Sequence, residues 1–146
     1  MKRPLCTASE RRLRSALRQC GLTTAAVRAV VQQRPFADDG ALCAVVDEVL
    51  IRLDDRELAR ALSAEPEPVI DEGADDVRKA AMLALRLYRD RFGYAYVSSI
   101  AAPTADELLM RVRIRLGNEP APEGRAAREH LRRLVRDRLQ TLMNAE

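Results

Sequence analysis

Histidine and cysteine, which often transfer protons near neutral pH or bind metals, are scarce in this 146-residue sequence. His130 is the only histidine, a residue type that often serves as a general acid or base. It lies among arginines and follows Glu129, so a solvated helix face is the stronger interpretation. The cysteines are odd in number and widely spaced, without a CxxC pair or a histidine cluster: Cys6, Cys20 and Cys43. We therefore predict no metal, and buried free thiols in a reducing compartment.

Arginine dominates the charged residues. The chain carries 25 basic and 22 acidic residues, and only Lys2 and Lys79 are lysines. The two signs alternate along the sequence, which is typical of solvated helix faces. Near the C-terminus, Glu123, Glu129 and Asp137 interrupt a run of arginines that no helix-turn-helix or zinc-finger pattern accompanies. We predict no nucleic-acid partner, and interpret the arginine content first as a coding bias.

The elements that must position these residues are helices. Aromatic residues make up 3% of the chain and Trp is absent, so the core is built from Leu, Val, Ile and Ala, a mixture that favours helices. The length suits one domain, residues 1–146, with one core. No apolar segment approaches the length of a membrane span or a signal peptide. We therefore predict a cytoplasmic, all-α protein without a membrane partner.

Capping residues, glycines and prolines predict where the helices begin and end. Residues 7–10, Thr-Ala-Ser-Glu, form a capping-box pattern, and Gly21 would end the helix that this box opens. Residues 94–97 are predicted as an isolated extended piece after the long central helix, because the chain offers no partner strand. Further helices are predicted at about 24–33, 40–53, 55–63, 75–92 and 105–116, and after a loop at 119–124.

Three segments, in order, resemble a known family. Residues 34–36 read Arg-Pro-Phe. Residues 88–97, Tyr-Arg-Asp-Arg-Phe-Gly-Tyr-Ala-Tyr-Val, are similar to a Tyr-x-x-(Lys/Arg)-Phe-Gly-Phe-Pro-Phe-Val run. Residues 115–118, Arg-Leu-Gly-Asn, match an Arg-Leu-x-Asn pattern at the expected distance, and the last helix ends in an Arg138-Leu139 pair. The sequence thus resembles the 2-oxo-4-hydroxy-4-carboxy-5-ureidoimidazoline (OHCU) decarboxylase family from about residue 28 onward.

The resemblance implies a compact, single-domain bundle of helices that forms a homodimer. It also implies decarboxylation of a urate-degradation intermediate to (S)-allantoin, without metal or organic cofactor. Loss of CO₂ leaves a carbanion that must be protonated on one face, so the reaction needs a positioned acid and a cation that binds the anionic substrate. In the family, a His-Pro pair supplies the acid, a Glu-Gln pair contacts the substrate and the arginine of Arg-Leu-x-Asn binds its anionic end.

The family residues carry over only in part. Arg115 matches the family arginine, and Pro66 matches the proline of the His-Pro pair, but Glu65 stands where the histidine should be. No Glu-Gln pair follows, and Ala95 replaces the proline of the aromatic run. The resemblance makes Glu65 and Arg115 candidate catalytic residues, and the following residues candidate substrate contacts: Pro66, Tyr94, Tyr96, Val97 and Asn118.

Each candidate also has a simpler interpretation. Glu65 is either an acid or base in an apolar pocket or a solvated loop carboxylate, and Arg115 is either an anion ligand or a surface arginine. Three functions follow. A diverged, cofactor-independent enzyme would act on a small anionic heterocycle or oxo-acid, in specialised metabolism. A true OHCU decarboxylase would use Glu65 in place of the histidine. A non-catalytic protein would use the helical dimer as a binding or scaffolding module.

Overall fold

The computed structural model describes residues 4–68, 70, 72–102 and 104–145. Over these residues it contains seven α-helices, one short 3-10 helix and no strand: η1 (Leu5–Thr7), α1 (Glu10–Gln19), α2 (Thr24–Val31), α3 (Asp39–Ile51), α4 (Asp55–Ser63), α5 (Asp75–Phe92), α6 (Ala105–Leu116) and α7 (Pro120–Asn144). The predicted all-α class is confirmed, and the segment after α5 is irregular. That residues 1–146 form a single domain stays a prediction.

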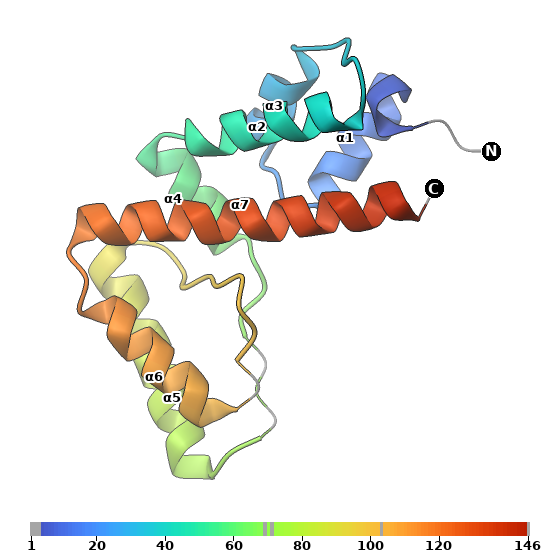
Figure 1. Cartoon of the computed structure of the whole chain (residues 1–146). Helices are drawn as coiled ribbons and strands as arrows, with labels where there is room; N and C mark the ends of the chain where they lie inside the picture. The colour runs from blue at the N-terminus through green and yellow to red at the C-terminus, as the bar shows by residue number, and fades with distance from the viewer. Residues whose placement is uncertain (1–3, 69, 71, 103, 146) are drawn as a thin grey trace.

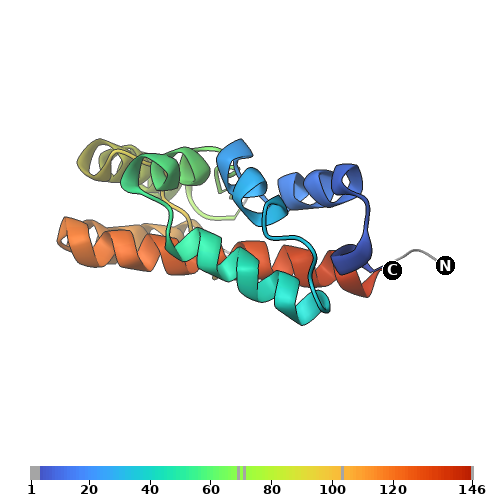
Figure 2. The same cartoon turned by 90° about the horizontal axis from the view of Figure 1, so that it is seen from above.

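Helix α7 is the axis of the molecule. Figure 1 shows it running between the N-terminal helices on one side and the α5–α6 pair on the other. In Figure 2, α3 lies alongside part of α7, and these two helices pack against each other. No helix formed by the described residues is long and apolar enough to cross a membrane. The described parts of the segments that follow α4 and α5 run on the α5–α6 side of α7.

Two clusters of buried apolar side chains fill these groups. The larger joins α1–α4 to one face of α7 through residues such as Leu17, Val46 and Leu131. The smaller lies between α5 and α6, around Tyr88 and Leu108. Successive residues of the segment after α5 belong to different clusters, because Tyr96 packs in the smaller and Val97 in the larger. Residues 96–97 therefore connect the two cores.

Side-chain caps begin most of the helices. The oxygens of Asp38, Asp54 and Thr104 accept from the backbone N–H three residues further on, at the starts of α3, α4 and α6. The first capping box is shifted from its predicted position. Ser9, not Thr7, caps α1 by accepting from the N–H of Arg12, because Thr7 belongs to η1.

The start of α7 differs from the sequence-based expectation. Residues 119–124 were predicted to form a loop, but the helix begins at Pro120 and includes Pro122 and Gly124. Proline lacks the backbone N–H, and this donor has no partner in the first turn of a helix in any case. Pro120 and Pro122 therefore cost the helix no hydrogen bond. The early start places Glu123 inside the molecule, where it is fully buried.

Candidate active site

A pocket of about 340 Å³ opens where the two clusters meet. Its walls come from the turn after α4, the segment after α5 and one face of α7. They include Leu108 from the smaller cluster and Leu134, which packs on the larger. We call it the Glu65 pocket; its further lining residues are Glu65, Pro66, Pro68, Tyr96, Val97, Ser98, Ile100, Ala101, Ala102 and Arg138.

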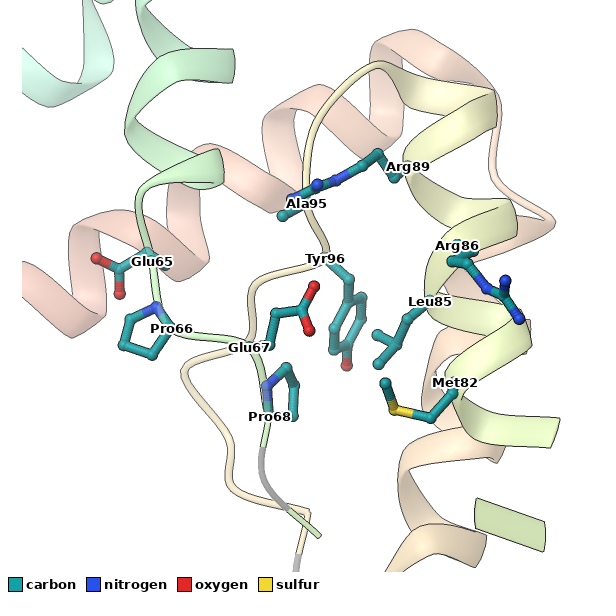
Figure 3. Close-up of a pocket in the computed structure, with 10 residues that line it drawn as sticks. All are labelled: Glu65, Pro66, Glu67, Pro68, Met82, Leu85, Arg86, Arg89, Ala95 and Tyr96. Atoms are coloured by element: carbon teal, nitrogen blue, oxygen red, sulfur yellow. The ribbon is translucent and has the colours of Figure 1, made fainter. Parts of the chain in front are cut away.

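A smaller hollow of about 70 Å³ adjoins the Glu65 pocket and shares Glu65, Pro66, Pro68 and Tyr96 with it. Figure 3 shows the ring of Tyr96 between Pro66 and Pro68 of the turn and the side chains of α5. Two arginines of α5, Arg86 and Arg89, line this hollow. The combined cavity thus has apolar walls and a few convergent charged groups, which is the usual composition of a small-molecule site.

Glu65 and Arg138 form a two-pronged ion pair in the wall of the pocket. Arg138 Nη2 donates to Glu65 Oε1 at 2.6 Å and Nη1 donates to Oε2 at 3.0 Å. Nη1 also donates to the carbonyl of Cys20 at 3.1 Å, at the C-terminal end of α1. The side chain of Glu65 is 7% exposed and that of Arg138 is 35% exposed. The hydrogen bonds with Glu65 raise the pKa of Arg138, so its charge is secure.

Gly21 makes room for this ion pair. Its φ is +104°, in the left-handed region, as expected for the glycine predicted to end α1. A Cβ atom at this position would lie 2.9 Å from Arg138 Nη1 and 3.0 Å from Glu65 Oε2. The turn after α1 therefore holds the arginine through a carbonyl and leaves space for the carboxylate.

Arg115 lies behind the pocket and does not line it. Its Nε donates to Glu123 Oε1 at 2.5 Å, Nη1 to the carbonyl of Val97 at 2.5 Å, and Nη2 to the hydroxyl of Tyr88 at 3.2 Å. The Tyr88 hydroxyl in turn donates to Glu123 at 3.1 Å. The Arg115 guanidinium also lies 4.5 Å from the centre of the Tyr96 ring. Arg115 thus holds the Tyr96–Val97 segment from inside the molecule, and its predicted role as a direct anion ligand stays a prediction.

Two other predicted contacts lie elsewhere. Tyr94 lines a separate pocket that shares no lining residue with the Glu65 pocket. The backbone carbonyl of Asn118 accepts from Arg91 Nη2 at 2.9 Å, beside that second pocket. Of the seven candidate residues, the structure gathers Glu65, Pro66, Tyr96 and Val97 in one pocket.

His130 and the cysteines are outside the Glu65 pocket. His130 Nδ1 accepts from the backbone N–H of Ser99 at 3.0 Å, and burial lowers the pKa of His130 to about 4, so its ring is neutral near pH 7. Burial raises the pKa of Cys20 to about 11, which leaves its thiol protonated. No group of His, Cys, Asp and Glu residues suited to a metal ion occurs within the described part of the chain.

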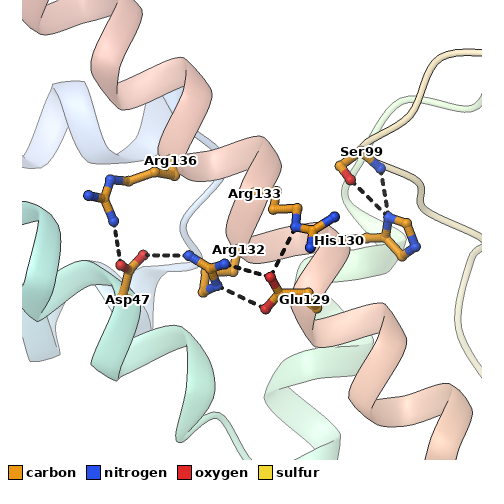
Figure 4. A network of polar contacts seen from close by, with 7 residues as sticks. All are labelled: Asp47, Ser99, Glu129, His130, Arg132, Arg133 and Arg136. Atoms are coloured by element: carbon orange, nitrogen blue, oxygen red, sulfur yellow. Dashed lines mark hydrogen bonds and ion pairs between the residues drawn. The ribbon is translucent and has the colours of Figure 1, made fainter.

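A charged network on α7 has a structural role. Figure 4 shows Asp47 of α3 contacting Arg132 and Arg136, while Glu129 contacts Arg132 and Arg133. These contacts connect α7 to α3 and occupy several of the arginines that the sequence assigned to a solvated face. The network leaves Arg138 as the arginine of α7 that reaches the Glu65 pocket.

Arg138 entered the sequence analysis only as part of the family resemblance and was not made a site candidate, although a signal for that role was present. Leu131, Val135 and Leu139 are fully or almost fully buried on one stripe of α7. Arg138 comes three residues after Val135 and falls on the edge of the same stripe. A charged residue on an apolar stripe is expensive to place unless it is paired. This position would have distinguished Arg138 from the arginines of the exposed face.

The fold and the pocket together define a class, that of compact all-α proteins with the allantoin synthase fold. The chain superposes on a crystal structure of (S)-allantoin synthase with a TM-score of 0.79 and 18% identity, over 94% of this chain and 52% of that one. It also superposes on a crystal structure of OHCU decarboxylase in the presence of (S)-allantoin, with a TM-score of 0.76 and 14% identity, over 94% and 99% of the two chains. At these identities the likeness establishes the fold.

The sequence comparisons identify the family. The OHCU decarboxylase family model matches residues 69–140. A 2-oxo-4-hydroxy-4-carboxy-5-ureidoimidazoline decarboxylase of Amia calva is 38% identical over 56 residues, which are 38% of this chain and 32% of that relative. The matched stretch thus spans about a third of the relative's length. The chain belongs to the OHCU decarboxylase family, as the three sequence segments predicted.

Proposed function

We propose that this protein binds a small anionic heterocycle in the Glu65 pocket and removes CO₂ from it without a metal or organic cofactor. The observation that carries the proposal is the bidentate Glu65–Arg138 ion pair in the pocket wall. The Arg138 guanidinium is a binding site for a carboxylate, and the side chain of Glu65 occupies that site. A substrate carboxylate can take the place of Glu65 on Arg138 without leaving the guanidinium unpaired. The family relationship supports OHCU, or a ring of the same kind, as the substrate.

The exchange also prepares the acid. Once displaced from Arg138, Glu65 stands without its cation at a position where its side chain is only 7% exposed. A carboxylate in such surroundings takes up a proton more readily. Glu65 would then hold the proton that the carbanion needs, next to the bound substrate.

The chemical step follows from these positions. The C–C bond to the substrate carboxylate breaks, CO₂ leaves, and the bonding electrons stay on the ring, where a carbonyl can hold them. The protonated Glu65 transfers its proton to the ring carbon, and the resulting carboxylate returns to Arg138. Each turnover consumes one proton from solvent, so atoms and charge balance.

Arg115 and Tyr96 have supporting roles in this proposal. Arg115 fixes the carbonyl of Val97 and the ring of Tyr96, both of which form the pocket wall. Arg115 is therefore proposed as a positioning residue, and Pro66, Tyr96 and Val97 as wall residues that orient the substrate ring. The resemblance further supports a homodimer in the cytoplasm, and light scattering after size-exclusion chromatography tests the dimer.

Circular dichroism tests the reaction directly. OHCU is generated in place from urate, and the appearance of (S)-allantoin is followed with the protein and with two pocket variants, Glu65→Gln and Arg138→Gln. We expect accelerated formation by the unmodified protein and a loss of about 10²-fold or more in each variant, since each loses an acid or an anion ligand. Arg133→Gln is the matched control, because Arg133 lies on the same helix and pairs with Glu129 outside the pocket.

Other outcomes would change the assignment. Formation at the spontaneous rate with all four proteins, together with saturable binding of an anionic ring that needs Arg138, would make the chain a non-catalytic binding module. Full activity in Glu65→Gln would remove Glu65 as the acid. Full activity in Arg138→Gln would place the substrate away from the Glu65 pocket.

A further inference from the structure

A second pocket lies beside Tyr94 and shares no residue with the Glu65 pocket. It has a volume of about 560 Å³ and is bounded by the starts of α4 and α7 and the end of α5. We call it the Tyr94 pocket. The residues used below are Asp55, Arg91, Phe92, Tyr94, Arg125 and Arg128.

The charge of the Tyr94 pocket favours an anion. Its lining residues include three arginines and one acidic residue, Asp55. Asp55 is fully exposed and, within the described part of the chain, pairs with Arg128 at 3.3 Å. Arg91 donates to a backbone carbonyl, which neutralises none of its charge, and Arg125 makes no hydrogen bond or ion pair with the described residues. The pocket therefore carries an excess of about two positive charges, concentrated by low-dielectric walls.

Arg128 carries an unsatisfied donor at this pocket. Its Nη2 donates to the carbonyl of Leu53 at 2.7 Å, but its Nε is buried and has no hydrogen-bond partner among the described residues. A buried donor without an acceptor costs free energy, so such a group usually has a role. Arg128 lines the pocket, so a rotation of its side chain could present Nε to an acceptor that enters the pocket.

Aromatic rings form the adjoining wall. The rings of Phe92 and Tyr94 lie 6.1 Å apart with planes inclined by only 29°, and the Arg91 guanidinium lies 5.1 Å from the centre of the Phe92 ring. Tyr94 is only partly buried, so part of its ring faces the pocket. Flat molecules pack well on such a wall.

We propose that the Tyr94 pocket is a second ligand site, which binds a small flat ring bearing a carboxylate. Arg125 and Arg128 would bind the carboxylate and the wall of Phe92 and Tyr94 would contact the ring. The inference rests on observations separate from the Glu65 pocket and holds whether or not that pocket is catalytic. Tyr94, predicted as a contact of the reacting substrate, would then contact a different molecule.

The experiment follows the arginine Nε–H resonances by NMR while benzoate is added to the full chain. The Arg128 resonance is assigned by its disappearance in Arg128→Lys. We expect this resonance to shift saturably, because its donor gains an acceptor, and Arg125→Gln to weaken the apparent affinity about fivefold or more. Acetate has the same charge and no ring, and it should bind about tenfold more weakly. Arg138→Gln changes the Glu65 pocket only, so the Arg128 resonance should shift with benzoate as it does in the unmodified protein.

Three results would overturn the proposal. Shifts that grow in proportion to benzoate across many exposed arginines would indicate a diffuse ion atmosphere. Equal binding of acetate and benzoate would remove the ring from the site. Loss of the Arg128 shift in Arg138→Gln would place benzoate in the Glu65 pocket, and would leave the proposed function standing.

Discussion

Two arginine–glutamate pairs lie on either side of residues 96–97, and they differ in what surrounds them. Arg115 and Glu123 are sealed inside the molecule, with a carbonyl and a tyrosine hydroxyl completing their hydrogen bonds. Glu65 and Arg138 are also joined by two hydrogen bonds, one from each Nη atom of the arginine, but they stand in the wall of a pocket. The comparison shows that the chemistry of a pair does not decide its role. A pair becomes available to a ligand only where another carboxylate can reach the arginine.

Removing Glu123 should have the largest effect on stability. Glu123 is fully buried and Arg115 is 8% exposed, so Glu123→Gln leaves a buried cation without its counter-charge. Breaking one side of a buried pair costs about 3–5 kcal/mol in the free energy of unfolding. Urea denaturation measures this loss. Glu119→Gln, an exposed change at the start of the same helix, is the control and should cost about 0.5 kcal/mol or less.

A side chain at position 21 should cost less stability but disturb the pocket. Gly21→Ala puts a Cβ in a left-handed conformation, at about 1–2 kcal/mol, and within 3.0 Å of both charged groups of the Glu65–Arg138 pair. We expect both a lower urea midpoint and weaker binding of anionic rings. Gly124→Ala, where a Cβ would meet nothing within 4 Å, is the control and should leave binding at the Glu65 pocket unchanged, since Gly124 does not line that pocket. Unchanged binding in Gly21→Ala would mean that the pair tolerates displacement.

The two pairs should also differ in coupling energy. In a double-mutant cycle with Glu65→Gln and Arg138→Gln, we expect about 1 kcal/mol, because Arg138 is 35% exposed and water can replace the lost partner. The corresponding cycle for Glu123 and Arg115 should give a larger value. Equal coupling energies for Glu65–Arg138 and Glu123–Arg115 would contradict the claim that only the second pair is closed to water.

The smallest effect should come from His130, whose pKa is lowered to about 4, first by burial and then by nearby arginines. The unfolded chain binds a proton near pH 6.5 while the folded protein does not, so stability is present above pH 6.5 and falls as the pH drops towards 4. Since the ring is partly exposed, we expect about 1 kcal/mol over this window. His130→Asn should flatten the pH dependence of the urea midpoint between pH 6.5 and 4. An identical slope in both proteins would assign that loss to other groups.

Most of the fold could be predicted because its signals are local. Asp38, Asp54 and Thr104 each cap a helix whose first turn lies within three residues, and Gly93 ends α5 in the left-handed conformation. The predicted start of α7 was too late because Pro120 and Pro122 were interpreted as loop residues. Proline is tolerated in the first turn of a helix, which is where both lie.

The site was predicted less completely because its contacts are not local. Glu65 and Arg138 are 73 positions apart in the sequence, and no local sequence pattern predicts that they form an ion pair. The family pattern made Arg115 a candidate anion ligand. Its buried ion-pair partner, Glu123, was predicted to lie in a loop, so the pairing was not foreseen. Glu65, Pro66, Tyr96 and Val97 became candidates through the family resemblance, and the structure places all four in one pocket because the segments after α4 and α5 both line it.

The central claim is that Glu65 occupies a carboxylate site on Arg138 that a substrate would take. Isothermal titration with imidazole-4-carboxylate, a stable ring carboxylate, tests it most directly. We expect Glu65→Gln to bind this anion about tenfold more tightly than the unmodified protein, because the competing carboxylate is gone, and Arg138→Gln to abolish binding at the Glu65 pocket. Equal or weaker binding by Glu65→Gln, or unchanged binding by Arg138→Gln, would contradict the account.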